Sequence, residues 1–460
     1  MYSKTNSSIL FLACVLVLLA CKPKEHSKTT IPDPILSEIE SELENLTKVW
    51  YPKSIDTING GFWSDFNYKW EKEGAQNKMI VSQARHVWTS AVLAEFYKDD
   101  SFEKIAKHGF HFLRDKMWDS VNGGFHTLIG FEGDAINVIS KNKSTYGNAF
   151  AIYGLATYYK ASNNTDALDL AKKTFEWLEE HAHDSIYKGY FDVLHQNGSW
   201  MLDITEDNGY DNFNRKDWKD QNSSIHLLEC LTALYEVWPN ELVRKRLEEL
   251  LLLIRDTITT EKGYLTLHLH RDWSPVTFKD SSEAYQKQNF GLDHVSFGHD
   301  VETAFLMLEA SHILGIKNDT LTKVKAKQMV DHGITKGWDK KEGGFYDGGY
   351  YYDTETCTVV KKDKVWWTEA EGLNSLLLMA KLYPNDTIYN NLFQKQWQYI
   401  KKNMIDHKYH GWYAQGLDTD PQASKKVKAQ IWKVNYHNIR SLINVIRMLK
   451  GEFILTQKAH

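Results

Sequence analysis

Six short motifs, each made of one or two glycines followed by an aromatic residue, recur along this chain and constrain its fold more than any other feature. They are GGFW at Gly60, GGFH at Gly123, GYF at Gly189, GYL at Gly263, GGFY at Gly343 and GWY at Gly411. Measured from the last glycine of each motif, successive motifs lie 63 to 81 residues apart. Such spacing indicates a repeated supersecondary unit. We expect each motif to form a short turn or β-hairpin at one rim, where glycine allows a positive φ.

Two helix-like runs lie between successive motifs. For example, residues 149–161 (AFAIYGLATYYKA) are nearly apolar all round, whereas residues 166–182 (DALDLAKKTFEWLEEHA) are amphipathic. A helix with no polar face must be covered on all sides, and an amphipathic helix can lie outside it. Six such hairpins predict an all-α (α/α)6 barrel in one domain, over residues 35–455. An open solenoid is the competing architecture, but it would need polar caps at both ends, and the sequence shows none.

The first 34 residues have a different pattern. Lys4 precedes twelve apolar residues, ILFLACVLVLLA, a run that is too short for a membrane span and is typical of a secretory signal. The residues LLAC ending at Cys21 resemble the lipobox of bacterial lipoproteins, which implies cleavage before Cys21 and lipid attachment to it. We therefore expect a signal peptide over 1–20, a tether over 21–34 and a lipid anchor in the bacterial cell envelope, facing the periplasm. The alternative is an ordinary secreted protein with an incidental cysteine.

Composition narrows the possible partners. The net charge is −5 and the signs are mixed along the chain, so no nucleic-acid footprint is expected. After cleavage, Cys21, Cys230 and Cys357 remain, which excludes a disulfide framework and a cysteine-based zinc site. Aromatic residues make up 13% of the chain. They are the usual platforms for sugar faces and equally fill cores, so they suggest a carbohydrate partner without proving one.

Polar and aromatic side chains that are unusual for a buried helix stand where each inner helix should begin, 22 to 37 residues after a motif. Equivalent places in a closed ring converge on one axial pocket, so these side chains should line a single concave site. The set comprises Arg85, Tyr146, Asn222 with His226, His299 with Glu302, Trp367 with Glu371, and Trp432 with His437.

The chemistry of this set favours proton transfer at carbon. Three histidines, one arginine and two glutamates lack the simplest hydrolase signature, which is two acids facing each other across a scissile bond. Imidazole is available in neutral and protonated forms near pH 7, so two histidines can take and return a proton. Arg85 suits the enolate oxygen that forms when a proton next to a carbonyl is removed. The inventory therefore predicts proton abstraction α to a carbonyl.

A metal site is the alternative for His299 and Glu302. Residues three apart share a helix face, and His226 and His437 could supply further ligands. Arg85 beside the same cavity would oppose a divalent cation. We therefore expect no metal and no other cofactor, and interpret Glu302 as a residue that orients His299 or holds a substrate hydroxyl.

Six segments, in order over nearly the whole mature chain, carry a family resemblance. They are RHVW, YGNAF, NSSIHLLE, GHDVE, WWTEAE and WKVNYHNIR. They resemble the N-acylglucosamine 2-epimerase family, and most closely its cellobiose 2-epimerase branch. The resemblance implies that His299 and His437 are the two acid/base residues. It also implies that Asn222 and His226 contact the reacting sugar and that Arg85 holds its oxygen.

Aromatic and acidic residues complete the implied sugar site. By the same resemblance, Trp367 and Glu371 bind sugar hydroxyls and stack a ring, Trp432 is a second platform, and Tyr146 contacts the substrate. Three positions depart from the pattern of relatives: Phe305 where tryptophan is frequent, and Glu369 and Asn148 where glutamine is frequent. We expect these departures to affect the preference for the second sugar and not the proton transfer.

Three function classes remain. The first is a 2-epimerase that interconverts the reducing-end glucose and mannose units of a β-linked disaccharide by ring opening and an enediolate, as a monomer. Substrates such as mannobiose or a monosaccharide, and aldose–ketose isomerisation, are variants within the same family. The second class is an (α/α)6 glycoside hydrolase or lyase that uses Asp300, Glu302 or Glu371. The third is a sugar-binding lipoprotein without chemistry.

The lipid anchor is tested by Cys21→Ser. The acylated cysteine would be the only membrane attachment, so the variant should move from the membrane fraction to the soluble fraction without loss of turnover. Fractionation of cells and detection of the protein in each fraction measure this. Unchanged membrane association of Cys21→Ser would contradict the lipoprotein interpretation.

Overall fold

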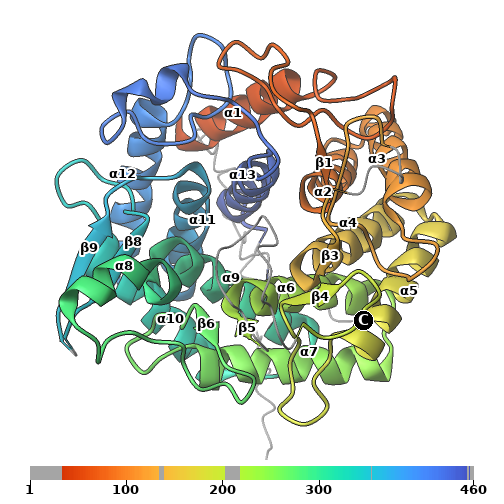
Figure 1. Cartoon of the computed structure of the whole chain (residues 1–460). Coiled ribbons are helices and arrows are strands. Elements are labelled where there is room, and N and C mark those ends of the chain that lie inside the picture. Colours follow the sequence, from red (N-terminus) through yellow and green to blue (C-terminus); the bar gives the residue numbers. More distant parts are fainter. Residues whose placement is uncertain (1–33, 134–138, 202–217, 354, 453–454, 456–460) are drawn as a thin grey trace, which may run out of the picture.

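A closed ring of helices is the architecture of the computed structural model (Figure 1). The structure describes residues 34–133, 139–201, 218–353, 355–452 and 455. The predicted signal peptide, Cys21 and the tether up to residue 33 lie outside these residues, so those expectations stay predictions. Within the described ranges, none of the helices combines the length and the hydropathy that crossing a bilayer requires.

Six inner helices surround the axis. They are α2 (Ile80–Tyr97), α4 (Thr145–Ser162), α6 (Gln221–Val237), α9 (Phe297–Ile313), α11 (Trp366–Leu382) and α13 (Tyr436–Leu449). Each packs against the next, and α13 packs against α2, which closes the ring and rules out an open solenoid. Most of their residues are buried on every side, which explains why the sequence of these helices lacks a polar face.

Six outer helices cover the inner ring. They are α1 (Pro34–Trp50), α3 (Asp100–Phe112), α5 (Thr165–His181), α7 (Glu241–Leu253), α10 (Thr320–His332) and α12 (Thr387–Asn403). The prediction of an (α/α)6 barrel is confirmed. Five of the pairs are hairpins, as predicted, but the sixth pair consists of α13 and α1, which are far apart in sequence. Helix packing needs complementary apolar faces, not adjacency in the chain, so α1 can cover α13.

The outer helices begin at the capping residues that their sequences offer. The side chain at each N-cap accepts a hydrogen bond from a backbone N–H of the first turn, as expected for Asp and Asn. These N-caps are Asp99, Asn164, Asn240, Asp319 and Asp386.

Short π-helical turns η1 (Leu113–Met117), η3 (Ile254–Ile258) and η4 (Gly333–Gly337) follow three of these helices, and a 3-10 turn, η5 (Pro421–Lys425), lies near the C-terminal end.

The glycine motifs form tight turns, as predicted. The aromatic residue of the motif makes a single β-bridge with a residue before the turn, for example Phe62 with Ile55 and Phe125 with Trp118. Both glycines of the first motif have positive φ, at 85° and 66°. The turns therefore lie between an outer helix and the next inner helix at one rim of the barrel.

A buried aspartate–lysine ion pair joins most of these turns to the following inner helix. The pairs are Asp56–Lys78 (2.6 Å), Asp119–Lys143 (2.9 Å), Asp184–Lys219 (3.1 Å), Asp339–Lys364 (2.8 Å) and Asp406–Lys428 (2.7 Å). In the fourth repeat, Thr260 stands in the turn and Val295 stands two residues before α9, so both partners are absent together. The sequence analysis did not identify these pairs.

Short antiparallel strands link neighbouring repeats at the same rim. β1 (Lys78–Met79) pairs with β2 (Leu128–Ile129), β3 (Asn142–Ser144) with β4 (Val193–His195), and β5 (Lys219–Asp220) with β6 (His268–Leu269). The fourth sheet has three strands, β7 (Val295–Ser296), β8 (Gly348–Tyr351) and β9 (Cys357–Lys361). An additional helix, α8 (Glu283–Asp293), precedes β7 and accounts for the longest spacing between motifs.

The ion pairs should stabilise the fold as matched units. Asp119→Ala leaves the buried ammonium of Lys143 without its carboxylate, and we expect the free energy of unfolding to fall by about 3 to 5 kcal/mol. The double variant Asp119→Thr with Lys143→Val reproduces the residues of the fourth repeat and should recover most of that loss. Chemical denaturation measures both variants. A double variant no more stable than Asp119→Ala would contradict the role assigned to the pair.

Candidate active site

A cavity of about 750 Å³ opens at the rim where the inner helices begin. Tyr146, Asn222, His299 and Trp432, four of the residues predicted for the site, line it. They come from α4, α6, α9 and the segment before α13. The expectation that equivalent positions of the repeats meet in one concave site is therefore met by these four residues.

Two of the predicted histidines are held by buried carboxylates. His226 Nδ1 lies 2.8 Å from Glu229 Oε2, and His437 Nδ1 lies 2.8 Å from Glu371 Oε1. A carboxylate accepts a hydrogen bond from Nδ1–H, which fixes the tautomer and leaves Nε2 as the atom that can exchange a proton with a substrate. The structure therefore supports an acid/base role for His437 and gives His226 the same arrangement.

The third histidine has a different environment. His299 Nδ1 lies 2.8 Å from the Ser296 hydroxyl, not beside Glu302. The interpretation that Glu302 orients His299 is wrong, because Glu302 points toward α13, where its Oε1 lies 3.7 Å from His437 Nδ1. The His299 ring packs on the Trp367 indole with centroids 4.6 Å apart, and the same indole lies 5.8 Å from the His437 ring. The two predicted acid/base residues thus flank one tryptophan.

Beneath the histidines, Arg440 of α13 binds three glutamates from three other inner helices. Its guanidinium donates to Glu229 of α6, to Glu302 of α9 and, at 2.6 Å, to Glu371 of α11. The Tyr436 hydroxyl also donates to Glu229. All of these side chains are buried. One cation therefore fixes the two carboxylates that orient His226 and His437.

The charge of this cluster determines where protons reside. Burial raises the pKa of Glu371 to about 8, and the Glu302 carboxylate adds to the rise while Arg440 opposes it. Burial also disfavours the charged form of Glu229, but Arg440 and His226 outweigh it and hold its pKa at about 2. Counting Arg85 and Arg440 against the three glutamates leaves one negative charge, so we infer that one further proton is shared by Glu371 and His437.

The accepting imidazoles are kept neutral. Burial lowers the pKa of His299 to about 3, and the neighbouring His226 and His294 add to the shift. Burial, assisted by Arg85 and Arg440, lowers the pKa of His437 well below its ordinary value. A neutral ring is the form that removes a proton from carbon.

Arg85 reaches the same site from α2. It donates to the Tyr146 hydroxyl at 2.8 Å, and its guanidinium lies over the Phe150 ring at 4.3 Å and the Tyr436 ring at 4.9 Å. The aromatic faces hold the cation without neutralising it. Arg85 can therefore stabilise a developing oxyanion, as the sequence predicted.

Glu302 and Glu371 lie one layer below the residues that line the cavity. Each uses one oxygen for Arg440, and in both the Oε2 atom is buried with no hydrogen-bond partner among the described residues. A carboxylate oxygen without a partner in a buried site can accept a sugar hydroxyl. Their predicted substrate-binding role stays a prediction.

The three departures from the relatives do not face the cavity. Asn148 and Glu369 accept hydrogen bonds from the backbone N–H groups of Phe125 and Phe345, the aromatic residues of two glycine motifs. Phe305 packs against the Arg440 guanidinium, 5.8 Å from its ring centroid. Asn148 and Glu369 hold turns and Phe305 packs on a buried cation, so the expectation that these positions affect the preference for a second sugar stays a prediction.

The Arg440 guanidinium also bears on the alternative that this site binds a metal ion. Glu302, Glu371 and His437 place one donor atom each within 4.8 Å of one another. Both carboxylates, however, bind Arg440, which supplies the positive charge that a metal would bring. This donor set therefore does not fit a divalent cation.

Sequence reasoning missed the residues that hold the histidines. Glu229 stands three residues after His226, Arg440 three after His437, and Ser296 three before His299. Residues three apart share a helix face, so Glu229 and Arg440, charged residues in otherwise apolar helices, were the available signal. Ser296, an uncharged residue of β7, gave no such signal.

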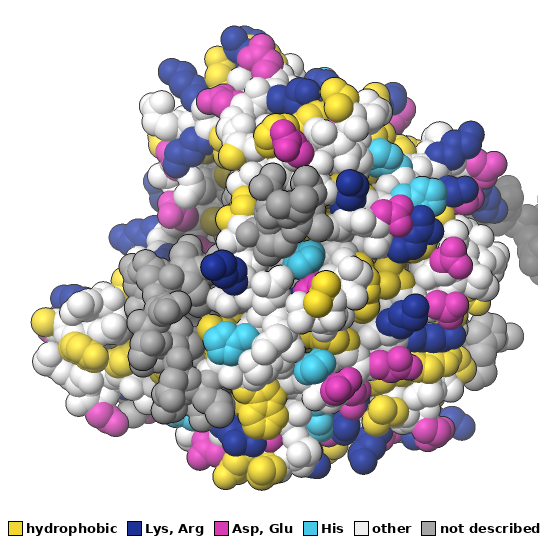
Figure 2. Space-filling model, turned by 45° about the vertical axis from the view of Figure 1, so that its right-hand side comes forward, with side chains coloured by type: hydrophobic (Ala, Val, Ile, Leu, Met, Phe, Trp, Pro, Cys, Tyr) yellow, Lys and Arg dark blue, Asp and Glu magenta, His cyan; other side chains and the backbone are white. Residues whose placement is uncertain are grey.

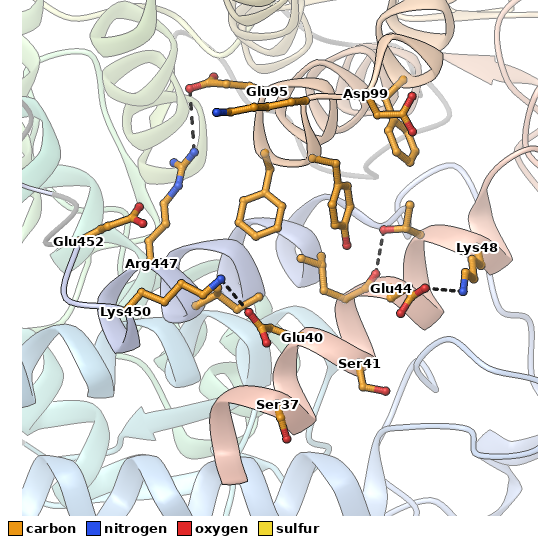
Figure 3. Close-up of a pocket in the computed structure, with 17 residues that line it drawn as sticks. Ser37, Glu40, Ser41, Glu44, Lys48, Glu95, Asp99, Arg447, Lys450 and Glu452 are labelled. Carbon is orange, nitrogen blue, oxygen red and sulfur yellow. Dashed lines mark hydrogen bonds and ion pairs between the residues drawn. The ribbon is translucent and has the colours of Figure 1, made fainter. Parts of the chain in front are cut away.

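A second, larger groove has different chemistry. It measures about 1010 Å³ and lies between α1, α2 and α13, and ion pairs such as Glu40–Lys450 and Arg447–Glu95 cross it (Figure 3). None of the described residues that line it is a histidine. On the face shown in Figure 2, acidic and basic side chains are interspersed rather than gathered by sign.

Comparison with known proteins agrees with the geometry. The profile of the N-acylglucosamine 2-epimerase (GlcNAc 2-epimerase) family matches residues 61–441. The cellobiose 2-epimerase of Dictyoglomus turgidum is 27% identical over 414 residues, which cover 90% of this chain and 98% of the relative. The D-mannose isomerase of Marinomonas mediterranea is 23% identical over 415 residues, which cover 89% and 97%.

A solved structure extends the comparison to the fold. The cellobiose 2-epimerase from Spirochaeta thermophila superimposes with a TM-score of 0.77 at 25% identity, over 92% of this chain and 99% of that one. The family match runs from the first glycine turn to α13 and includes every histidine of the site. The chain belongs to the N-acylglucosamine 2-epimerase family.

Proposed function

We propose that this carbohydrate 2-epimerase interconverts the reducing-end glucose and mannose units of a β-linked disaccharide. The observation that carries the proposal is the pair His299 and His437, which flank the Trp367 indole with both Nδ1 atoms held by buried partners. Two neutral imidazoles that share one ring platform can act on opposite faces of one carbon. The names of the relatives support a sugar epimerase, and the disaccharide is our inference from them.

The reaction requires no net change in oxidation state. The ring form opens to an aldehyde, which acidifies the C2 hydrogen. The Nε2 atom of one histidine removes that proton and leaves an enediolate, whose oxygen Arg85 stabilises. The other histidine then returns a proton to the opposite face of C2, and the ring closes. His226, held by Glu229, is placed to contact the reacting sugar during opening and closing.

The charge of the buried cluster fits this cycle. One proton shared by His437 and Glu371 makes that pair the acid, while His299 without a carboxylate partner is the base. In the reverse direction the roles exchange. Because the enediolate is common to epimerisation and to aldose–ketose isomerisation, a monosaccharide isomerase of the same family is the second candidate, supported by the D-mannose isomerase relative.

The three carboxyl groups considered for a glycoside hydrolase have other roles in the structure. Asp300 is fully buried and accepts a hydrogen bond from the backbone N–H of Leu265, so it holds a turn. Glu302 and Glu371 bind Arg440. All three carboxyl groups are thus held by partners within the protein, whereas a hydrolase needs two that face each other across the scissile bond. A sugar-binding protein without chemistry would not need the buried network beneath the histidines.

The proposed location is the cell envelope, with a lipid on Cys21 and a monomeric barrel. Helix α1 begins at Pro34, and its Glu40 pairs at 2.8 Å with Lys450, directly after α13. The inner helices begin at the cavity rim, so the end of α13 lies at the opposite rim. An anchor joined to α1 would therefore direct the sugar cavity away from the membrane.

Isotope incorporation tests the two-histidine mechanism. In D2O, the epimer should carry deuterium at C2, because the returning proton comes from an acid that exchanges with solvent. His299→Ala and His437→Ala should each abolish epimer formation, while either can still wash deuterium into unepimerised substrate. NMR of the sugar measures both. Product without C2 deuterium would point instead to transient oxidation or an internal hydride shift.

Acidification should inhibit the enzyme in a defined direction. The pKa of His299 is depressed, so the neutral base persists below the ordinary histidine range and activity is lost only as the pH falls through that lowered pKa. The apparent value belongs to the coupled site. A loss of kcat/KM centred at or above about pH 6.5, the ordinary histidine value, would contradict this environment for His299.

Substitution of Trp432 should affect substrate binding, whereas substitution of Trp367 should affect the proton-transfer step. Trp432 lines the cavity and is 37% exposed, so Trp432→Ala should raise KM for a disaccharide roughly fivefold, for about 1 kcal/mol of lost stacking. Trp367 contacts both catalytic rings, so Trp367→Ala should lower kcat for disaccharide and monosaccharide alike. Steady-state kinetics on both substrates decide this. A disaccharide-specific loss in Trp367→Ala would place that ring at the second sugar.

A further inference from the structure

The fourth repeat differs from the others at the point where it presents His299. It lacks the aspartate–lysine pair, it contains the additional helix α8, and its sheet has a third strand, β9. In Figure 1 these elements lie together at one side of the ring. The β9 strand ends at Lys361, a lysine that the mechanism above does not use.

Lys361 is in register with the residue that holds His299. Across the sheet, Ser296 of β7 pairs with Gly348 of β8, and Gly348 pairs with Lys361 of β9. The Ser296 hydroxyl contacts His299 Nδ1 at 2.8 Å. Backbone hydrogen bonding therefore fixes the position of Lys361 relative to His299.

A glycine in the middle of this row lets the outer side chains meet. A Cβ atom on Gly348 would lie 2.9 Å from the His294 ring and 3.4 Å from the Lys361 side chain. Without it, Lys361 Nζ approaches His294 Nε2 at 3.2 Å. An ammonium only donates, so His294 accepts through Nε2 and keeps its proton on Nδ1, which faces Gly291 O at 3.2 Å. His294 is thus neutral and lines the cavity beside His299.

The charges around His299 come from several elements. Burial disfavours its protonation most, and Lys361 on β9 and Arg85 on α2 add to this effect. His226 on α6 and His294 before β7 oppose it further only when they are protonated. His437 on α13 also interacts with it electrostatically. Asp347, 3.8 Å from Lys361, is an acidic group beside this lysine. His437 differs in having carboxylates beside it, Glu371 at 2.8 Å and Glu302 at 3.7 Å, although burial, Arg85 and Arg440 lower its pKa as well.

We propose that Lys361 is a positioning residue whose ammonium, held against His294 at the cavity, adds to burial in keeping His299 unprotonated and ready to accept the C2 proton. The inference rests on the proposed function, because it gives a purpose to the neutral state of His299. It also separates the roles of the two histidines on one platform. His437 has Glu371 at 2.8 Å to share a proton with, whereas His299 has a nearby ammonium and no carboxylate partner.

A charge series at residue 361 tests the proposal. NMR titration of His299 in the full chain should show its pKa rising by roughly half a pH unit in Lys361→Gln and by about twice as much in Lys361→Glu, with Lys361→Arg unchanged. The acid limb of kcat/KM should move to higher pH in the same order. Lys362→Glu is the matched control, because Lys362 is the next residue and is exposed, where solvent screens its charge. It should leave the His299 titration unchanged.

The outcomes separate the inference from the function. A His299 titration that is the same in the native protein and in the Lys361→Gln and Lys361→Glu variants would overturn the inference, as would an equal shift in Lys362→Glu. Gly348→Ala provides a second measurement if Lys361→Glu does not fold, since it should displace the Lys361–His294 pair and raise the same pKa without changing any charge. Retained epimerisation in His299→Ala would instead overturn the proposed function itself.

Discussion

The hydrogen-bonded cluster around Arg440 is the interaction on which the site depends. One guanidinium binds carboxylates from α6, α9 and α11, so four of the six inner helices meet at a single cation. Two of these carboxylates orient His226 and His437. A buried charge without partners costs several kcal/mol, so removal of any member would leave the others uncompensated. The cluster therefore ties the geometry of the proton-transfer groups to the closure of the barrel.

A second layer of buried charge lies at the rim. Aspartate–lysine pairs connect the glycine turns to the inner helices in five repeats, and side chains such as Gln83 and Asn148 bind the backbone of the turns from the helix side. The repeat that presents His299 has exchanged the pair for Thr260 and Val295. A different cation, Lys361, stands near the cavity there. The same rim thus supports the fold in most repeats and tunes a histidine in one.

The fold was predictable because its signal is distributed over the whole chain. Six motifs and alternating apolar and amphipathic runs indicated the ring, although they did not indicate that α1 covers α13. Tyr146 and His299 line one cavity. Arg85 and His226 contact Tyr146, and His437 is connected to His299 through the Trp367 ring. The roles of Glu302 and Glu369 could not be predicted from the sequence, because each side chain could face the cavity, a turn or a cation. Only the direction of each side chain in the closed ring decides among these.

The sequence by itself determined the repeat, the apolar inner helices and the residue types that converge at one rim, because periodicity and burial follow from local pattern. The tertiary structure decided which partner each polar group has. Glu302 lies beside His437 and not His299, and the Ser296 hydroxyl contacts His299. The carboxylates that could have bound a metal ion bind the Arg440 guanidinium instead. Arg440 also binds Glu229, which is 211 positions away in the chain. The physical reason is that the free energy of a buried charge depends on its neighbours in space, which the chain sets only when the ring closes.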